Sequence, residues 1–92
     1  MFHLLSTHDL PASVIHSWVQ RAAAFKAGAS SQCAVGKTGV FITDRPSLRT
    51  RASFMLAFEA LGGTFHSFLP SEIGLGQRES TEDIAGVLGR YY

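Results

Sequence analysis

The sequence predicts an α/β fold, an open layer of parallel strands and helices in the order αβαβα. Two short apolar runs rich in β-formers, residues 37–43 and 64–69, flank a segment with helical spacing. The first run is continuously apolar at its centre rather than alternating, as in a parallel strand that is covered on both faces. A strand, a helix and a second strand with short joints make a βαβ unit.

Length and composition limit the functions that the chain can have. Its 92 residues make at most one small domain. The net charge of +1 provides no overall basic field that would attract nucleic acid. Cys33 is the only cysteine, which excludes an internal disulfide and a multi-cysteine metal site and fits a reducing compartment. There is no signal-peptide pattern and no apolar run of about 18–20 residues, so we expect a soluble, cytoplasmic protein.

The first element in chain order is an amphipathic helix. It is expected to begin near Pro11, because proline is tolerated in the first turn of a helix, and to end at Gly28. Trp18 is expected to anchor the core from this helix. Residues 27–36 are rich in Gly, Ala and Ser and predict a loop. Apolar side chains recur at spacings of three or four along one face: Leu10, Val14, Trp18, Ala22 and Phe25.

The second helix follows the first strand through a turn at residues 44–47. Pro46 biases Arg45 away from helical angles, so the helix cannot begin earlier, and Ser47 is then the expected N-cap. The apolar helical pattern runs over residues 52–61. Three large apolar side chains of this pattern share the face expected to cover the sheet: Phe54, Phe58 and Leu61.

The last part of the chain predicts a strand, a loop and a helix. Gly62 and Gly63 end the second helix, and the second strand leads into a loop over residues 70–79. Ser80 is expected to cap the final helix, which carries negative charge in its first turn. A sheet of two strands is thin for independent stability. The sequence therefore predicts the first part of a larger doubly wound domain.

The turn between the first strand and the second helix predicts an anion site. A helix that starts directly after a strand presents free backbone N–H groups and the positive end of its dipole. Here the hydroxyls of Ser47 and Thr50 and the guanidinium groups of Arg49 and Arg51 lie at the same place. Arginine binds phosphate oxygens in a bidentate way, and fixed donors stabilise charge that develops on a leaving phosphate. The P-loop pattern is absent.

Several landmarks follow one another along the chain. They are Arg-Pro-Ser-Leu-Arg-Thr-Arg-Ala-Ser-Phe at 45–54, Leu-Gly-Gly at 61–63, Leu-Gly at 75–76 with Glu79, Ser80 and Asp83, and Val-Leu-Gly-Arg-Tyr at 87–91. Together they resemble the amino-terminal, carbamoyl-phosphate-binding domain of the ornithine/aspartate carbamoyltransferase family. The family motif, Ser-Thr-Arg-Thr-Arg in most members, is highly specific between a strand and a helix.

The resemblance implies a transferase of arginine metabolism that moves a carbamoyl group from carbamoyl phosphate to an amine. It implies the δ-amine of ornithine as the acceptor, giving citrulline and phosphate; N-acylornithine, aspartate and putrescine are alternative acceptors. It implies no cofactor and no metal. Homotrimers or assemblies of trimers are the partners that it implies, with neither nucleic acid nor a membrane.

The resemblance also implies roles for particular residues. The substrate-binding residues for carbamoyl phosphate would be Ser47, Leu48, Arg49 and Thr50. Arg49 would be the catalytic group, because it would pair with the phosphate and its developing charge. Three further positions are secondary: Arg51 would brace the turn, and Gly74 and Gln77 lie in the loop that reaches a neighbouring subunit's site in this family.

The chain departs from the family pattern at several positions. Leu48 replaces the usual Thr, Met55 replaces a frequent Glu, and Gly74 stands where several ornithine enzymes carry Gln or His. Gln77 or Arg78 would then have to supply the contact of that loop. The family's later His-Pro-x-Gln segment and the amine-binding domain are absent from residues 1–92, so we expect a partial domain without turnover of its own.

Two other functions stay open at this point. The same arginines would suit a small anion- or RNA-binding module, although the near-zero net charge and the lack of an aromatic–basic surface pattern disfavour RNA. Alternatively, the chain is a non-catalytic fragment that associates with full-length subunits. The four histidines show no metal-ligand spacing and are expected at the surface or in packing contacts: His3, His8, His16 and His66.

Overall fold

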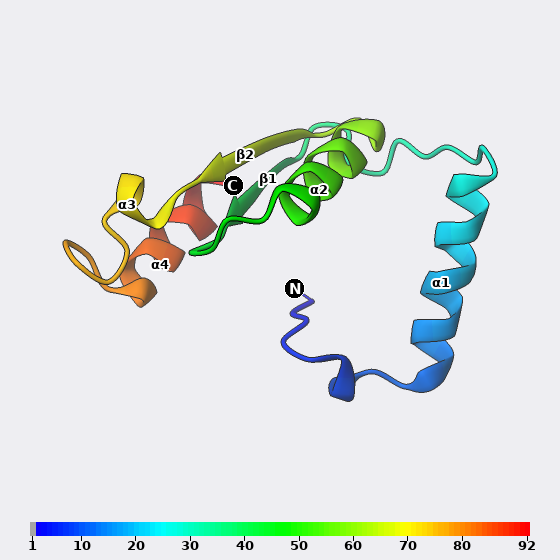
Figure 1. Cartoon of the computed structure of the whole chain (residues 1–92), viewed down its shortest axis with the longest axis horizontal. Helices are drawn as coiled ribbons and strands as arrows, with labels where there is room; N and C mark the ends of the chain where they lie inside the picture. The colour runs from blue at the N-terminus through cyan, green and yellow to red at the C-terminus, as the bar shows by residue number, and fades with distance from the viewer. Residues whose placement is uncertain (1) are drawn as a thin grey trace. The chain divides into compact units, whose positions relative to one another are not determined.

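The computed structural model describes residues 2–92 and divides the chain into two compact units, Met1–Ser30 and Ser31–Tyr92. Figure 1 labels the elements of both units along the chain. No helix within residues 2–92 is both long enough and apolar enough to cross a membrane.

The first unit contains a 3-10 turn, Thr7–Asp9, and helix α1, Ala12–Lys26. The predicted end of the helix is confirmed. Gly28 has a φ of +112° and donates from its N–H to the Phe25 carbonyl at 3.0 Å. The next N–H, of Ala29, reaches the Ala24 carbonyl at 3.0 Å. This pair of bonds is the Schellman motif, in which a left-handed glycine satisfies the last carbonyls of a helix.

The expectation that Trp18 anchors the core is wrong. No residue of α1 is buried, and the Trp18 side chain keeps 43% of its surface exposed. The unit consists of one short turn and one helix, so it provides no second layer that would cover the apolar face of α1.

The second unit is the predicted βαβ arrangement. Strands β1, Thr38–Ile42, and β2, Thr64–Phe68, pair in parallel, and helix α2, Leu48–Ala60, connects them. The register places Gly39 beside Phe65 and Val40 beside His66. The α/β fold class with a parallel sheet is therefore confirmed. All five residues of β1 are half-buried rather than fully covered.

An aromatic cluster joins α2 to one face of the sheet. The ring centroids of Phe41 and Phe54 lie 5.6 Å apart, and those of Phe58 and Phe65 lie 5.7 Å apart. Phe41 and Phe65 connect the two pairs at 6.2 Å. The predicted apolar face of α2 does meet the sheet, but Phe54 stays 55% exposed because no further element covers it.

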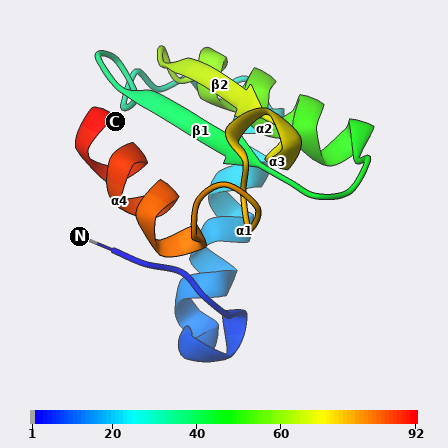
Figure 2. The same cartoon turned by 90° about the vertical axis from the view of Figure 1, so that its left-hand side faces the viewer.

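The last helix, α4 (Thr81–Tyr91), begins as predicted, because the Ser80 hydroxyl accepts a hydrogen bond from the Asp83 N–H at 3.2 Å. Its carboxyl end meets the other face of the sheet, where His66 Nδ1 and Tyr92 Oη are 2.9 Å apart. Figure 2 shows α4 on the side of the sheet away from α2.

One element start agrees with the prediction and one segment differs from it. Helix α2 begins at Leu48, directly after the expected N-cap Ser47, so a polar first turn precedes the apolar pattern of residues 52–61. The segment 70–79 is not entirely loop, since it opens with a one-turn helix, α3, Pro70–Ile73. The Leu69 N–H donates to Glu72 Oε1 at 2.7 Å and the Glu72 N–H returns a bond to the Leu69 carbonyl at 3.0 Å, which stabilises this turn.

Candidate functional site

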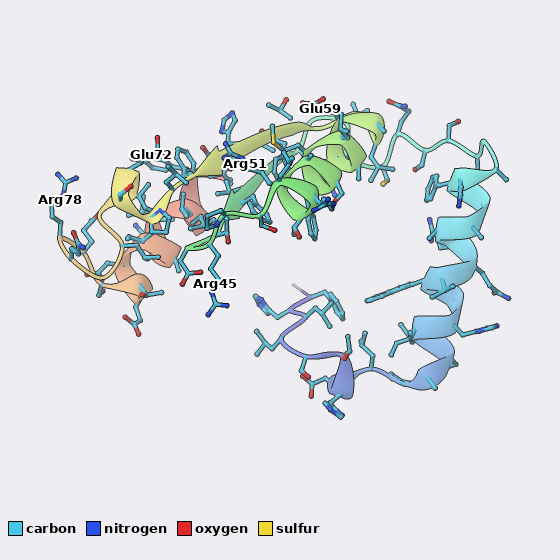
Figure 3. All side chains as sticks on the ribbon, viewed as in Figure 1. Arg45, Arg51, Glu59, Glu72 and Arg78 are labelled. Atoms are coloured by element: carbon cyan, nitrogen blue, oxygen red, sulfur yellow. The ribbon has the colours of Figure 1, made fainter. Side chains whose placement is uncertain are left out.

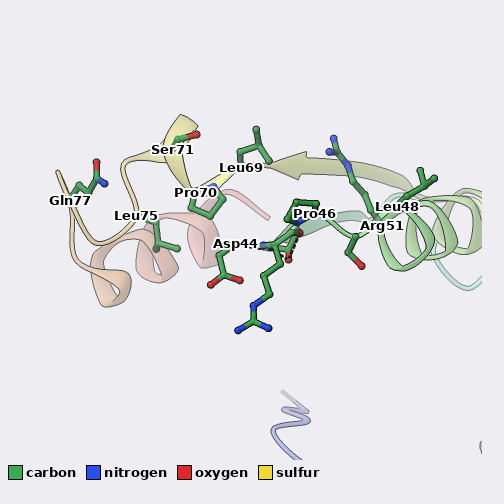
Figure 4. A pocket seen from close by; sticks show the side chains of 12 residues that line it. Asp44, Pro46, Leu48, Arg51, Leu69, Pro70, Ser71, Leu75 and Gln77 are labelled. Carbon is green, nitrogen blue, oxygen red and sulfur yellow. Dashed lines mark hydrogen bonds between the residues drawn. The ribbon is translucent and has the colours of Figure 1, made fainter.

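A cavity of about 720 Å³ lies where β1 and β2 end. One wall is the segment from Thr43 to Leu48 together with Arg51, and the other is formed by residues 69–71, Leu75 and Gln77. Figure 4 shows the two walls as they follow the two strands. Ligands of open α/β sheets bind at the carboxyl ends of the strands, so this cavity lies where the fold class predicts a site.

The first wall is a turn held by its own hydrogen bonds. The Thr43 hydroxyl accepts from the Arg45 N–H and donates to the Arg45 carbonyl, each at 3.3 Å. These bonds are drawn dashed in Figure 4. Pro46 follows, and its ring restricts Arg45 to extended angles. The chain thus passes from the strand to the helix through a short, constrained path.

The helix that follows begins with free backbone donors. Ser47 occupies the predicted N-cap position, but its side chain makes no capping hydrogen bond, which corrects that part of the expectation. The first N–H with a partner within residues 2–92 is that of Arg51, which reaches the Ser47 carbonyl at 3.0 Å. The three preceding amides, of residues 48–50, point along the axis at the positive end of the helix dipole. This arrangement suits an anion.

Only part of the predicted residue set lines the cavity. Ser47, Leu48, Arg51 and Gln77 belong to its lining, whereas Arg49, Thr50 and Gly74 do not. Leu48 and Arg51 are three residues apart and so share one face of α2. Arg49 and Thr50 project from other faces and contribute their backbone N–H groups to the helix start. The catalytic role of Arg49 stays a prediction.

Gly74 shapes the second wall without lining the cavity. Its φ of +69° is left-handed, and a Cβ there would lie 3.0 Å from the Arg78 Cβ. Its carbonyl accepts from the N–H groups of Gln77 at 3.1 Å and Arg78 at 3.0 Å. This tight turn brings Gln77 back to the cavity, and it accounts for a glycine at the position where the family resemblance suggests a polar side chain.

The sequence placed Asp44, Arg45 and Pro46 in the turn of the predicted site without giving them a binding role. The other lining residues were missed by reasoning from the sequence: Thr43, Leu69, Pro70, Ser71 and Leu75. All of them except Leu75 lie within three positions of the end of a parallel strand, which is the signal that could have predicted them. Figure 3 shows the side chains of Arg45 and Arg51 pointing to opposite sides of the ribbon. Within residues 2–92, no group of three or more His, Cys, Asp or Glu side chains would hold a metal ion.

Comparisons with known proteins agree on one family. The family model described as aspartate/ornithine carbamoyltransferase, carbamoyl-P binding domain, matches residues 3–92. The chain is 39% identical over 93 residues to the ornithine carbamoyltransferase of Bradyrhizobium diazoefficiens, which covers 97% of this chain and 30% of the relative. It is 37% identical over 94 residues to the ornithine carbamoyltransferase of Methanopyrus kandleri, and this match also covers 97% of the chain and 30% of the relative.

Another match is shorter and has a higher identity. The ornithine carbamoyltransferase of Chlorobaculum tepidum is 53% identical over 55 residues, which is 60% of this chain and 16% of the relative. The chain therefore spans about 30% of the length of the full-coverage relatives.

Proposed function

We propose, because this chain belongs to the aspartate/ornithine carbamoyltransferase family through its carbamoyl-phosphate-binding domain, that the turn between β1 and α2 binds the phosphoryl group of carbamoyl phosphate. The observation that carries the proposal is the cavity at the carboxyl ends of both strands, with the amides of residues 48–50 at its helix start and Arg51 in its lining. These donors are fixed by the fold before a ligand binds, which lowers the ordering cost of binding.

In the complete reaction the turn acts as the electrostatic part of the site. The neutral amine attacks the carbamoyl carbon, phosphate leaves with the electrons of the broken C–O bond, and the proton lost from the amine passes to the departing phosphate or to water. Helix amides and arginines stabilise the negative charge that grows on the departing phosphate. From the family motif we assign the main charge contact to Arg49, with Ser47 and Thr50 supplying hydroxyls. The place of Arg51 in the cavity lining supports a second charge contact from that residue.

The acceptor that we propose is ornithine, because the relatives that cover the whole chain are named ornithine carbamoyltransferase. Residues 3–92 match the carbamoyl-phosphate-binding domain of that family. We therefore expect binding of carbamoyl phosphate, and no citrulline formation, by the 92-residue chain alone. The trimeric assembly and the cytoplasmic location stay predictions.

A ligand-induced rise in melting temperature tests the proposal. A ligand that binds only the folded state at a hundredfold excess over its Kd stabilises that state by about 2.7 kcal/mol. Hydrogen bonds to charged groups contribute about 1.5–3 kcal/mol each, so Arg49→Ala is expected to weaken binding by at least about tenfold and to abolish most of the rise. Arg51→Ala is expected to reduce the rise in melting temperature without abolishing it.

Arg90→Ala is the matched control, because Arg90 lies in the last turn of α4 and does not line the cavity. It should leave the carbamoyl phosphate response unchanged. The proposal fails if carbamoyl phosphate does not raise the melting temperature of the unaltered chain. It also fails if both Arg49→Ala and Arg51→Ala respond as strongly as the unaltered chain does.

A further inference from the structure

One threonine closes a small ring of hydrogen bonds at the start of the phosphate-binding turn. Thr43 directly follows β1, which ends at Ile42, and its hydroxyl both accepts from the Arg45 N–H and donates to the Arg45 carbonyl at 3.3 Å. The Thr43 hydroxyl oxygen therefore holds both the N–H and the carbonyl of Arg45. Hydroxyl side chains bond to nearby backbone in this way in turns.

The ring is the only hydrogen-bonded support of the turn from within the described residues. Among residues 2–92, no other hydrogen bond reaches the segment 44–46. On the far side Pro46 lacks an N–H and restricts the angles of Arg45 sterically. Arg45 is thus held by Thr43 on one side and by the Pro46 ring on the other, and these two constraints set where Ser47 and the first turn of α2 begin.

We propose that Thr43 is a positioning residue for the phosphoryl site. Its hydroxyl holds the turn so that Ser47 and Leu48, where α2 begins, lie in the wall of the cavity that Thr43 itself lines. This inference rests on the proposed function. Thr43 itself is half-buried and lines the cavity, while its two hydrogen bonds to Arg45 lie at the exposed side of the turn.

A pair of substitutions isolates the hydroxyl. Thr43→Val keeps the size and the β-branching of the side chain but neither donates nor accepts, whereas Thr43→Ser keeps the hydroxyl and loses the methyl group. The two readouts are the hydrogen exchange rate of the Arg45 amide without ligand, and a titration with inorganic phosphate followed at the amide signals of residues 48–50.

We expect Thr43→Val to speed exchange of the Arg45 amide and to weaken phosphate binding by about threefold to tenfold, the effect of losing a hydrogen bond of ordinary strength. Thr43→Ser should match the unaltered chain in both measurements. A merely structural role would speed exchange of the Arg45 amide without a loss of phosphate affinity.

The outcomes separate the two proposals. If phosphate shifts the amides of the unaltered chain and Thr43→Val binds it equally well, the positioning role is overturned and the phosphate site stands. Unchanged exchange of the Arg45 amide in Thr43→Val, or a loss of affinity in Thr43→Ser as large as in Thr43→Val, also overturns the role. If phosphate does not shift these amides in the unaltered chain, the proposed function and the positioning role both fail.

Discussion

Replacing Gly63 by alanine tests the packing that holds β2 against α2. Gly63 lies between the end of α2 and the first residue of β2. A Cβ built there would overlap the Phe58 ring, with Phe58 Cε1 as its nearest atom and Phe58 Cδ1 at 2.6 Å. The Ala34 Cβ, in one of the few buried side chains, would lie 3.1 Å away. Gly63 does not have a positive φ, so the expected effect is steric and not a matter of backbone strain.

The cost follows from what Phe58 has to give up. Its ring packs on Phe65 with centroids 5.7 Å apart, so it cannot turn away without losing that contact. Forcing one extra methyl group into a packed site costs about 1–3 kcal/mol. We therefore expect Gly63→Ala to lower the free energy of unfolding by that amount, measured by urea denaturation followed by circular dichroism.

Two further variants make the result interpretable. Gly86→Ala is the control, because nothing lies within 4 Å of a Cβ there. Gly86 is inside α4, so alanine should raise the stability by about 0.5–1 kcal/mol. In a Phe58→Leu background the cost of Gly63→Ala should shrink, because the clashing ring is gone. A Gly63→Ala variant as stable as the unaltered chain, or a cost that Phe58→Leu leaves unchanged, would refute the steric reasoning.

Two predictions concern the segment around the second wall of the cavity. Ser80→Ala should lower the free energy of unfolding by about 1 kcal/mol, because it removes the acceptor of the Asp83 N–H. Ser80→Asp keeps an acceptor oxygen and should keep the stability of the unaltered chain. Urea denaturation measures the free energy of unfolding of both variants. Glu72→Ala should speed hydrogen exchange of the Leu69 amide by removing the acceptor at 2.7 Å, and Glu72→Gln, which keeps an acceptor oxygen, should restore most of the protection. Equal exchange rates at Leu69 in all three chains would contradict the second prediction.

The parts of the fold that depend on local chemistry were predictable from the sequence. Gly28 and Gly62 end helices with left-handed backbone, and Ser80 caps a helix through its own hydroxyl. These events involve residues within about one helical turn, so the residue types alone predict them. The parallel pairing of two apolar runs about a helix is also a local βαβ rule.

Features that depend on distant packing were not predictable. Trp18 fits an amphipathic helix in sequence, but the unit that contains it offers no surface to cover its ring. Helix α3 is one turn long, which is too short to leave a periodic signal. Its support is a glutamate that binds the Leu69 amide, and leucine is not a residue that signals a helix start.

The candidate site divides in the same way. The first wall followed from a strand, a proline and a hydroxyl residue within a few positions of one another. The second wall did not, because Leu75 and Gln77 reach the cavity only through the register of β2 and the turn at Gly74. The side of α2 that faces the cavity was not predicted either, because Leu48 and Arg51 line it where Arg49 and Thr50 were expected beside Leu48.

The parallel register has a consequence for how the chain reaches its folded state. Thr38 pairs with Thr64 and Ile42 with Phe68, so every strand contact spans the whole of α2. A hairpin cannot start this sheet, because parallel neighbours need a crossover between them. The chain must therefore lose the conformational entropy of closing that span before any strand pair forms. We expect helix α2 to form early, which shortens the distance between the two strands, and strand pairing to be the slow step.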